Sequence, residues 1–546
     1  MSSFQMKGGI IQKYTVSNKQ ISKFQIKKGG NKLNNIKKSL VLVLLLSIVM
    51  VFTGMVSAED STVKIALGSE PSTLNPITFQ DYVTKIVINA MCDPLVGIDT
   101  EGKYTTEGSV LKDYTIEEQG KVYIFEVKEG IEFHNGEKLT AEDLKFTYES
   151  LMDKDLASPH RSYYTDIEKL ELLDEYTLKV TLKKPNAIFL STSRLRDAIL
   201  PKDYINEVGW DEFAKNPVGS GPYKFESYSS GQRIVLVKNE NYWGNKANID
   251  KVEFKFFPEN ATAVMALQKK DIDFMELPPK DFVRLKDQDN NNLSFGSFAE
   301  FTDARICFNK RPDSIFSNVK LRKAVAYAIN RENITALVEG NMAVPAVGRI
   351  PDFHPAYSDE VNAYEHNPEK AKELLKEAGY PDGFETKIFV SSGNSQRVLE
   401  VQQIQQDLAN VGIDCEVVAL EWGTYLDVTG EGEAPMYREN WPSVTIPEPY
   451  SFVSIWSSDS SWNPIFGTYE NEKVDKLITQ INQTIDPDER YELYKEVQKI
   501  AIDEVASYPL YWPVKGIGYN DDLNIPEELF SIFKMPSFHI NEWSFK

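Results

Sequence analysis

Two periodicities alternate along the chain after residue 60, and they limit the possible fold more than any other feature of the sequence. Residues 62–67, 121–128 and 176–182 alternate apolar with polar side chains, which is typical of half-buried β-strands. Other segments repeat apolar residues at the three- and four-residue spacing of amphipathic helices. The mixture predicts an α/β architecture without an internal repeat or a long linker.

Three of the expected helices have clear capping signals. The segment 140–152 begins with Thr-Ala-Glu-Asp, a capping box that satisfies the first backbone N–H groups of a helix. The segment 367–379 begins with Asn-Pro and ends with Gly, and a third helix is expected from Asp486-Pro487 to about Val505. In the first helix, the residues that recur on one face are Leu144, Tyr148, Leu151 and Met152.

The first 58 residues have the order of a secretory signal peptide. Lys37 and Lys38 precede an apolar run at residues 40–52, and the small residues up to Ala58 form the expected cleavage site. An uncleaved N-terminal anchor is the alternative, because residues 40–58 are long enough to cross a bilayer. In both cases we expect the body of the chain to be exported, to the extracellular or periplasmic face of the cell membrane.

The charge of the chain is divided between two segments. The first 58 residues contain nine lysines and no acidic residue, so the remaining 488 carry 51 basic and 81 acidic side chains and a formal charge of −30. A body this negative would repel phosphate backbones, so we expect no nucleic acid as a partner. The chain is 42% apolar and 12% aromatic, which is enough to bury real cores, and its length predicts two to four domains.

The sequence contains little that would support catalysis. The chain has three cysteines, Cys92, Cys307 and Cys415, and this small, odd number does not form a disulfide framework. Cys307 and Cys415 lie in strand-like segments, where we expect them to be buried. The five histidines show no HExxH arrangement, and neither GxSxG nor GxxxxGK(S/T) occurs. We therefore expect no enzyme, no metal site and no cofactor.

Six blocks of sequence follow one another in a characteristic order: residues 65–76, 128–143, 217–223, 321–330, 421–426 and 508–511. In this order they resemble the dipeptide-, oligopeptide- and nickel-binding receptors of ABC importers, called solute-binding protein family 5. The most specific block is 128–143, in which we interpret His134 as a turn and hydrogen-bonding residue. Gly219 and Gly221 of the third block are interpreted as residues that allow a turn.

The resemblance implies a type II periplasmic-binding-protein-like fold, with two lobes, a hinge and an inserted third domain. Such a protein encloses a peptide or peptide-like small solute between its lobes and delivers it to ABC transporter permease subunits. Lobe I is then expected at residues 59–90, 217–303 and 506–546, and the hinge strands near residues 301–309 and 507–520. Domain II is expected at residues 91–216 and lobe III at residues 304–505.

The resemblance also indicates which residues contact the solute. In the first lobe these are Phe79, Asp81 and Tyr82, and Tyr511 matches an aromatic residue on the second hinge strand. The segment 434–449 resembles the family's GW…D…(D/E)P stretch, and the contacts expected there are Arg438, Trp441 and Glu448. Arg397 lies three residues from a carboxylate-binding Arg of the dipeptide binders, so we expect it at a helix start on the surface.

One position departs from the pattern of the peptide binders. In those proteins an Asp three residues after the Trp holds the α-ammonium group of the peptide, whereas this chain has Val444. A buried ammonium without its carboxylate is costly, so the resemblance does not predict ordinary recognition of a free peptide N-terminus. Arg438 and Glu439 could bind a carboxylate or an amine instead, or they could pair with each other, and Glu448 is another partner for an amine.

Three other functions stay open, one of which is a signalling receptor that uses the same binding fold without feeding a transporter. A nickel or metal-chelate receptor on the same scaffold could use His160 or His354. A secreted hydrolase is the alternative from a different class, because many exported α/β proteins are enzymes, although no nucleophile with a neighbouring base stands out.

Overall fold

The computed structural model describes residues 60–546, except residues 80, 193–197, 289–291, 301, 339–341, 353, 443–447, 461–462, 465–466 and 532. The predicted signal peptide, its cleavage site after Ala58 and the position Val444 lie outside the described residues. Within the described part of the chain, no helix combines the length and the apolar character needed to cross a membrane.

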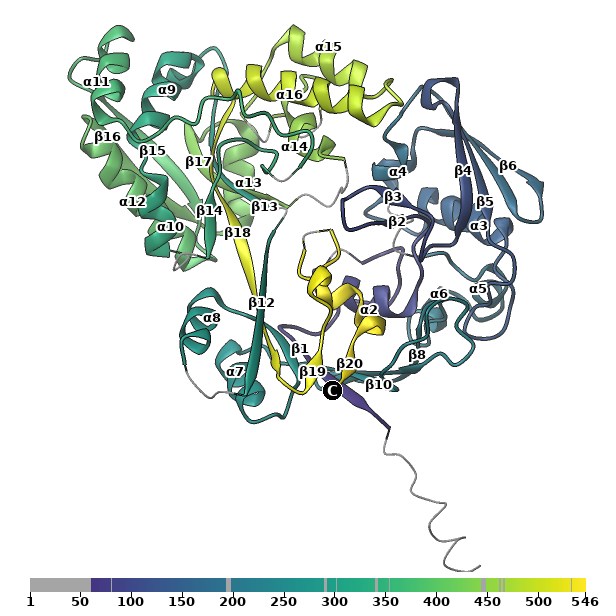
Figure 1. Cartoon of the computed structure of the whole chain (residues 1–546). Helices are drawn as coiled ribbons and strands as arrows, with labels where there is room; N and C mark the ends of the chain where they lie inside the picture. The colour runs from purple at the N-terminus through teal and green to yellow at the C-terminus, as the bar shows by residue number, and fades with distance from the viewer. Residues whose placement is uncertain are drawn as a thin grey trace, which may run out of the picture. The chain divides into compact units, whose positions relative to one another are not determined.

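A sheet of 12 strands is the largest element of the fold. The 14-residue strand β18 (Ser507–Asn520) pairs through its first part with β13 (Thr302–Phe308) and through its last part with β11 (Phe274–Leu277) and β12 (Leu293–Ala299). It therefore belongs to both halves of the sheet (Figure 1). On the β13 side of β18, the sheet continues outward with β17 (Met436–Pro442), β15 (Phe384–Ser391) and β16 (Ile413–Leu420). On the β11 side it continues with β1 (Thr62–Leu67), β10 (Lys251–Phe256), β9 (Arg233–Lys238) and β8 (Tyr223–Ser229). The short strand β14 (Ala343–Pro345) also pairs with β18.

A second, antiparallel sheet has the order β4 (Leu111–Glu117), β5 (Val122–Val127), β7 (Thr177–Leu182) and β6 (Ile167–Asp174). Alternate residues of β7 are buried, which is the pattern that the sequence shows. Strands β1, β5 and β7 thus confirm the three strands predicted from alternation. Two short pairs complete the strands, β2 (Gly97–Ile98) with β3 (Tyr104–Thr105) and β19 (Leu523–Asn524) with β20 (Ser544–Phe545).

The three capped helices are confirmed as α3 (Ala141–Met152), α11 (Pro368–Glu377) and α16 (Pro487–Asp503). In α3 the Thr140 side chain accepts the N–H of Glu142, and Asp143 accepts the N–H of Thr140 at 2.9 Å, so the capping box closes in both directions. The other helices of eight or more residues are α2 (Tyr82–Met91), α7 (Asn260–Gln268), α8 (Pro279–Lys286), α9 (Val319–Ala328), α10 (Arg331–Val338), α12 (Ser395–Ala409), α13 (Trp422–Glu431) and α15 (Glu472–Ile481).

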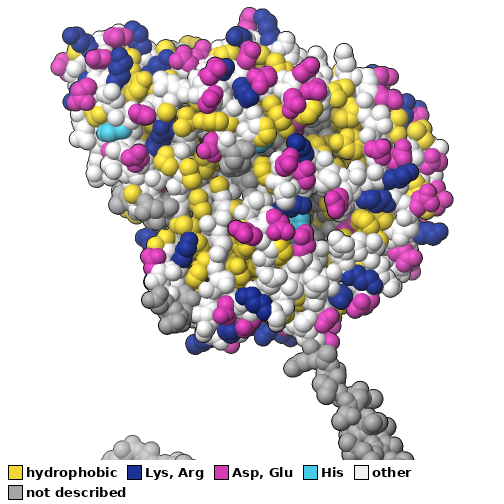
Figure 2. All heavy atoms as spheres, in the orientation of Figure 1, with side chains coloured by type: hydrophobic (Ala, Val, Ile, Leu, Met, Phe, Trp, Pro, Cys, Tyr) yellow, Lys and Arg dark blue, Asp and Glu magenta, His cyan; other side chains and the backbone are white. Residues whose placement is uncertain are grey.

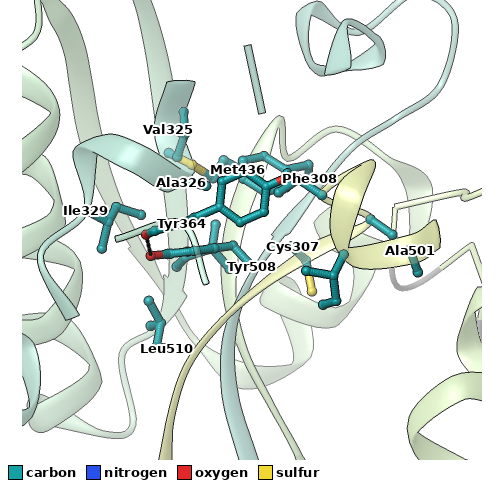
Figure 3. Packing of buried hydrophobic residues seen from close by; sticks show 14 of the residues in the cluster. Cys307, Phe308, Val325, Ala326, Ile329, Tyr364, Met436, Ala501, Tyr508 and Leu510 are labelled. Atoms are coloured by element: carbon teal, nitrogen blue, oxygen red, sulfur yellow. Dashed lines mark hydrogen bonds between the residues drawn. The ribbon is translucent and has the colours of Figure 1, made fainter. Parts of the chain in front are cut away.

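Buried apolar side chains form four clusters. The largest contains only residues between 304 and 512, and Figure 3 shows strand residues such as Cys307 and Met436 beside Val325 of α9 and Ala501 of α16. The second contains residues from 63–92, 198–298 and 517–543, the third residues from 77–213, and the fourth residues from 263–342. All three cysteines are buried, as predicted for Cys307 and Cys415, and burial raises the pKa of Cys415 to about 12.

The glycines of the third block are required by close packing. A Cβ on Gly219 would lie 2.2 Å from the carbonyl oxygen of Met91, and one on Gly221 would lie 2.5 Å from the carbonyl carbon of the same residue. Neither glycine has a positive φ angle, so it is the close approach of Met91 that would block a side chain at these two positions.

His134 forms three hydrogen bonds with the same two glycines, Gly219 and Gly221. Its N–H donates to the carbonyl of Gly219 at 2.8 Å, its Nδ1 accepts the N–H of Gly219 at 3.2 Å, and its Nε2 donates to the carbonyl of Gly221 at 3.0 Å. The predicted hydrogen-bonding role is confirmed. Burial lowers the pKa of His134 to about 4, which keeps the ring neutral.

Candidate functional site

Two of the predicted solute contacts, Phe79 and Asp81, have structural partners at the start of α2. Nε2 of His160 donates to the carbonyl of Phe79 at 2.8 Å, and the two rings meet edge to face with centroids 5.6 Å apart. The Asp81 carboxylate caps α2 by accepting the N–H of Thr84 at 2.7 Å. Burial works to raise the pKa of Asp81, but hydrogen bonds from Ser72 and Thr84 outweigh it and lower the pKa below its ordinary value.

The third predicted contact, Tyr82, belongs to a group that we call the Lys515 cluster: Tyr82 of α2, Glu276 of β11, Lys515 of β18, and Glu300 between β12 and β13. The Lys515 Nζ lies 2.8 Å from Glu276 Oε2 and 3.1 Å from Glu300 Oε1, and 4.0 Å from the centre of the Tyr82 ring. The Tyr82 hydroxyl donates to Glu276 Oε1 at 2.8 Å. The three charged side chains are 24–28% exposed.

Arg438 and Tyr511 are brought together by a third residue, Glu400 of α12. The Arg438 Nε donates to Glu400 Oε2 at 2.5 Å, its Nη2 donates to the Tyr511 hydroxyl at 3.3 Å, and the Tyr511 hydroxyl donates to Glu400 Oε1 at 2.7 Å. Arg438 also donates to the Asn440 side chain. We call Glu400, Arg438, Asn440 and Tyr511 the Arg438 network. It ties α12, β17 and β18 together, and Arg438 and Glu400 are each only 1% exposed.

A second buried ion network involves alternate residues of β13. Both nitrogens Nε and Nη2 of Arg349 donate to Asp303, at 2.9 and 3.1 Å, and Arg305 donates to the same carboxylate at 2.7 Å. All three side chains are fully buried. Burial works to raise the pKa of Asp303, but the two guanidinium groups hold it below its ordinary value. Asp303 therefore stays ionised and neutralises part of the charge of both arginines.

Glu439 does not pair with Arg438 through its side chain. Its Oε2 accepts the Tyr425 hydroxyl at 3.1 Å and its Oε1 accepts the N–H of Asn440 at 2.8 Å, whereas the Arg438 guanidinium contacts only the backbone carbonyl of Glu439. In the β13–β17 pair, Glu439 lies opposite Arg305. Arg438 and Glu439 are both buried, and each has its own set of partners.

The remaining predicted contacts lie further along the chain. Glu448 accepts two hydrogen bonds from Arg490 of α16, one of them at 3.1 Å from Nε, so its carboxylate already has a cationic partner. The backbone of Trp441 lies in β17 opposite Asp303, and its side chain is outside the described part of the structure. Arg397 lies in the first turn of α12, as expected.

The two histidines of the metal-chelate alternative have structural roles. His160 is buried against Phe79, and the Nδ1 of buried His354 accepts the N–H of Ala356 at 3.0 Å. Among the residues that the structure describes, no three His, Cys, Asp or Glu side chains are grouped in a way that could hold a metal ion.

Sequence reasoning missed Glu400, Asp303, Arg349 and Lys515. For Glu400 a signal exists: it precedes Ile404 and Leu408 by four and eight residues, so an acidic side chain occupies the buried face of a helix. For Lys515 there is none, because its partners come from three segments that are distant in the sequence.

These features define an α/β protein in which charged and aromatic side chains gather around the strands shared by both halves of the main sheet. The sequence profile described as "Bacterial extracellular solute-binding proteins, family 5 Middle" matches residues 105–464, and the chain belongs to this family. Its members are solute-binding receptors that work outside the cytoplasm.

Individual relatives agree with this assignment. The glutathione-binding protein GsiB of Escherichia coli K12 is 30% identical over 471 residues, which are 83% of this chain and 89% of that protein. The periplasmic binding protein DppA of Helicobacter pylori, in complex with the peptide STSA, has 28% identity and a TM-score of 0.71 over 89% of this chain and 98% of that chain. NikZ of Campylobacter jejuni, in complex with Ni(L-His), matches with 24% identity and a TM-score of 0.72 over 89% of this chain and 100% of that chain, which shows a shared fold alone.

Proposed function

We propose that this protein is the extracytoplasmic receptor of an ABC importer, that it captures a peptide or peptide-like solute, and that it has no enzymatic activity of its own. The observation that supports this most is the similarity to the peptide complex of DppA, which extends over 89% of the chain. GsiB, whose name gives glutathione as its solute, is similar over almost as much of the chain. Glutathione is itself a peptide-like molecule, so both relatives favour the same class of solute.

The proposed lobes follow the buried clusters. Most of the first cluster lies in lobe III at residues 304–505, but it continues to residue 512. Most of the second lies in lobe I at 59–90, 217–303 and 506–546, and most of the third in domain II at 91–216. Strand β18 and the consecutive strands β12 and β13 would then form the hinge, because they run from one cluster to the other. Bending of paired strands allows two rigid lobes to close without breaking either core.

We place the solute between the Lys515 cluster and the end of β17 that carries Trp441. Tyr82 and Trp441 would provide aromatic contact area with little sequence specificity, which suits a receptor for varied peptides. Arg438, Tyr511 and Glu448 would act mainly by shaping this wall, since their polar groups are bonded to one another or to Arg490. Phe79 and Asp81 would hold α2, and with it Tyr82, in place.

Calorimetric titration of the protein against peptide pools tests the proposal. We expect heat of binding from at least one pool among free, N-acetylated and C-amidated peptides of two to five residues, together with glutathione. Mass spectrometry of the molecule that co-purifies, after denaturation, would identify the natural solute. Absence of binding to every pool would reject the peptide assignment, and turnover of any peptide would reject the receptor assignment.

A further inference from the structure

Glu400 is a buried carboxylate to which the family resemblance assigns no role. It is 1% exposed and lies on the buried face of α12 with Ile404 and Leu408, where an apolar side chain would be expected. A carboxylate in such a place is strongly unfavourable unless a cation and hydrogen-bond donors meet it. Arg438 and Tyr511 meet this need, so Glu400 and the two predicted solute contacts form one unit.

The Arg438 guanidinium is almost completely occupied. Its Nε donates to Glu400, its Nη1 donates to the carbonyl of Glu439 at 2.5 Å and to the Asn440 side chain, and its Nη2 donates to Tyr511. A guanidinium has five N–H donors, so these contacts use all but one. The Nε and Nη2 donors that would bind a carboxylate from a solute are therefore already used, Nε by the Glu400 carboxylate and Nη2 by the Tyr511 hydroxyl.

Glu400 is the carboxylate that pairs with the buried Arg438 guanidinium. The neighbouring Asp303 pairs with Arg305 and Arg349, and Glu439 contacts Arg438 only through its backbone carbonyl. Removing the Glu400 charge would therefore leave Arg438 as a buried cation without its carboxylate partner. Such a cation gains most from any anion that reaches it, because the surroundings have a low dielectric.

We propose that Glu400 is a specificity-determining residue that occupies the carboxylate site of Arg438, so that the receptor takes solutes whose end facing β17 and β18 carries no free carboxylate. Amidated, esterified or internally linked peptides belong to this class. The choice of peptides rests on the proposed function, but the occupied anion site at Arg438 does not depend on it.

The anion site is tested without any peptide. In Glu400→Ala, the missing side chain leaves space beside Arg438, and acetate should refill it. We expect the thermal unfolding temperature of Glu400→Ala to rise with sodium acetate at pH 7, relative to sodium chloride at equal ionic strength, whereas wild type should respond equally to both salts. Asp407→Asn is the matched control, since Asp407 is also buried on α12 but binds Asn330 and Gln403.

The solute class is tested with pairs of one peptide, as free acid and as amide. Wild type should bind the amide at least as well as the acid, and Glu400→Gln, which keeps the shape of the site, should shift the ratio of affinities toward the acid by about tenfold. If the alanine variant does not fold, Glu400→Ser, which also leaves space beside Arg438, replaces it in the acetate series. The Asp407→Asn ratio should equal that of wild type.

Three results would overturn the inference. The first is no acetate-specific stabilisation of Glu400→Ala, or of the serine variant that replaces it. The second is an unchanged acid-to-amide ratio in Glu400→Gln, and the third is wild type that binds the acid about tenfold better than the amide. If wild type binds no peptide in either form, the proposed function fails, and the acetate series alone decides whether Glu400 occupies an anion site.

Discussion

Two titratable residues lie where Met91 packs against Gly219 and Gly221, and they determine how the stability of this region depends on pH. Asp93 is buried there and His134 is partly buried, both are hydrogen-bonded, and burial shifts their pKa values in opposite directions. Burial lowers the pKa of His134 to about 4 and raises that of Asp93 to about 6, although Tyr242 and Trp243 donate hydrogen bonds to Asp93. Both groups are therefore held closer to their neutral forms than in the unfolded chain.

The two shifts have opposite effects on stability between pH 4 and 6. The unfolded chain binds more protons at His134, whose folded pKa is depressed, so this contribution to stability is lost as pH falls from about 6.5 to about 4. The folded protein binds more protons at Asp93, whose folded pKa is raised, so this contribution is lost as pH rises from about 4 to about 6. In wild type the two contributions offset each other.

A variant that lacks one of the two titratable groups should show the pH dependence of stability that comes from the other. As pH increases from 4 to 6, the free energy of unfolding of Asp93→Asn should rise relative to that of wild type, by up to about 1.4 kcal/mol per pH unit. That of His134→Asn should fall relative to wild type as pH increases over the same interval. Urea unfolding at several pH values measures both slopes. Parallel pH profiles of both variants and wild type would contradict the assignment of these protonation states.

Among the secondary-structure elements, β18 connects the two halves of the main sheet. It pairs with strands from both halves of the sheet, and the Lys515 cluster lies in its middle, where Glu300 links β12 to β13 (Figure 1). Burial works to lower the pKa of Lys515, but the two carboxylates and the Tyr82 ring around the ammonium outweigh it and hold the pKa above its ordinary value. This single cation therefore fixes three other segments to the proposed hinge strand.

Lys515→Met should destabilise the protein by about 1–3 kcal/mol, because Glu276 and Glu300 lose a charge-assisted partner and repel each other. The double variant with Glu300→Gln should recover part of this loss, which a double-mutant cycle from urea unfolding would measure. Lys270→Met is the control: it removes pairs with Asp521 and Asp522 that are 43–68% exposed, and its cost should be much smaller than that of Lys515→Met. Equal losses for both lysines would show that the Lys515 cluster is no stronger than a surface pair.

At the scale of the whole molecule, the acidic body and the basic leader differ in the sign of their charge. Figure 2 shows acidic and basic side chains intermixed over one face of the body, so the negative net charge of the body is not gathered into one patch on that face. The nine lysines of the leader precede the apolar run of the predicted signal. The formal charge of −21 is thus the sum of a predicted export segment and a body of opposite sign.

Processing of the leader gives a prediction for the whole chain. If the signal is cleaved after Ala58, the exported protein should begin at Glu59, and its mass should be that of residues 59–546. N-terminal sequencing and intact-mass measurement of protein from the culture medium or the cell surface would establish the cut. Ala58→Lys should block cleavage and leave the protein attached to the membrane, while the body, whose first strand begins at Thr62, should keep its fold.

Much of the architecture follows from local rules. Alternation predicted β1, β5 and β7, and capping residues predicted α3, α11 and α16, because both signals involve residues within a few positions of one another. The candidate site was predictable only in part. Arg438 and Tyr511 were expected to lie near the solute, but their common partner Glu400 was not expected, since it lies 38 and 111 residues away in the sequence.

The α/β class, the acidity of the body and the family of the chain follow from the linear sequence, because periodicity, charge and the order of motifs are properties of the linear chain. Which charged groups meet depends on the folded structure: Glu400 with Arg438, Asp303 with Arg305 and Arg349, and Lys515 with Glu276 and Glu300. Pairing in a low-dielectric interior depends on distances of a few ångströms, and only the folded chain brings residues from distant segments that close.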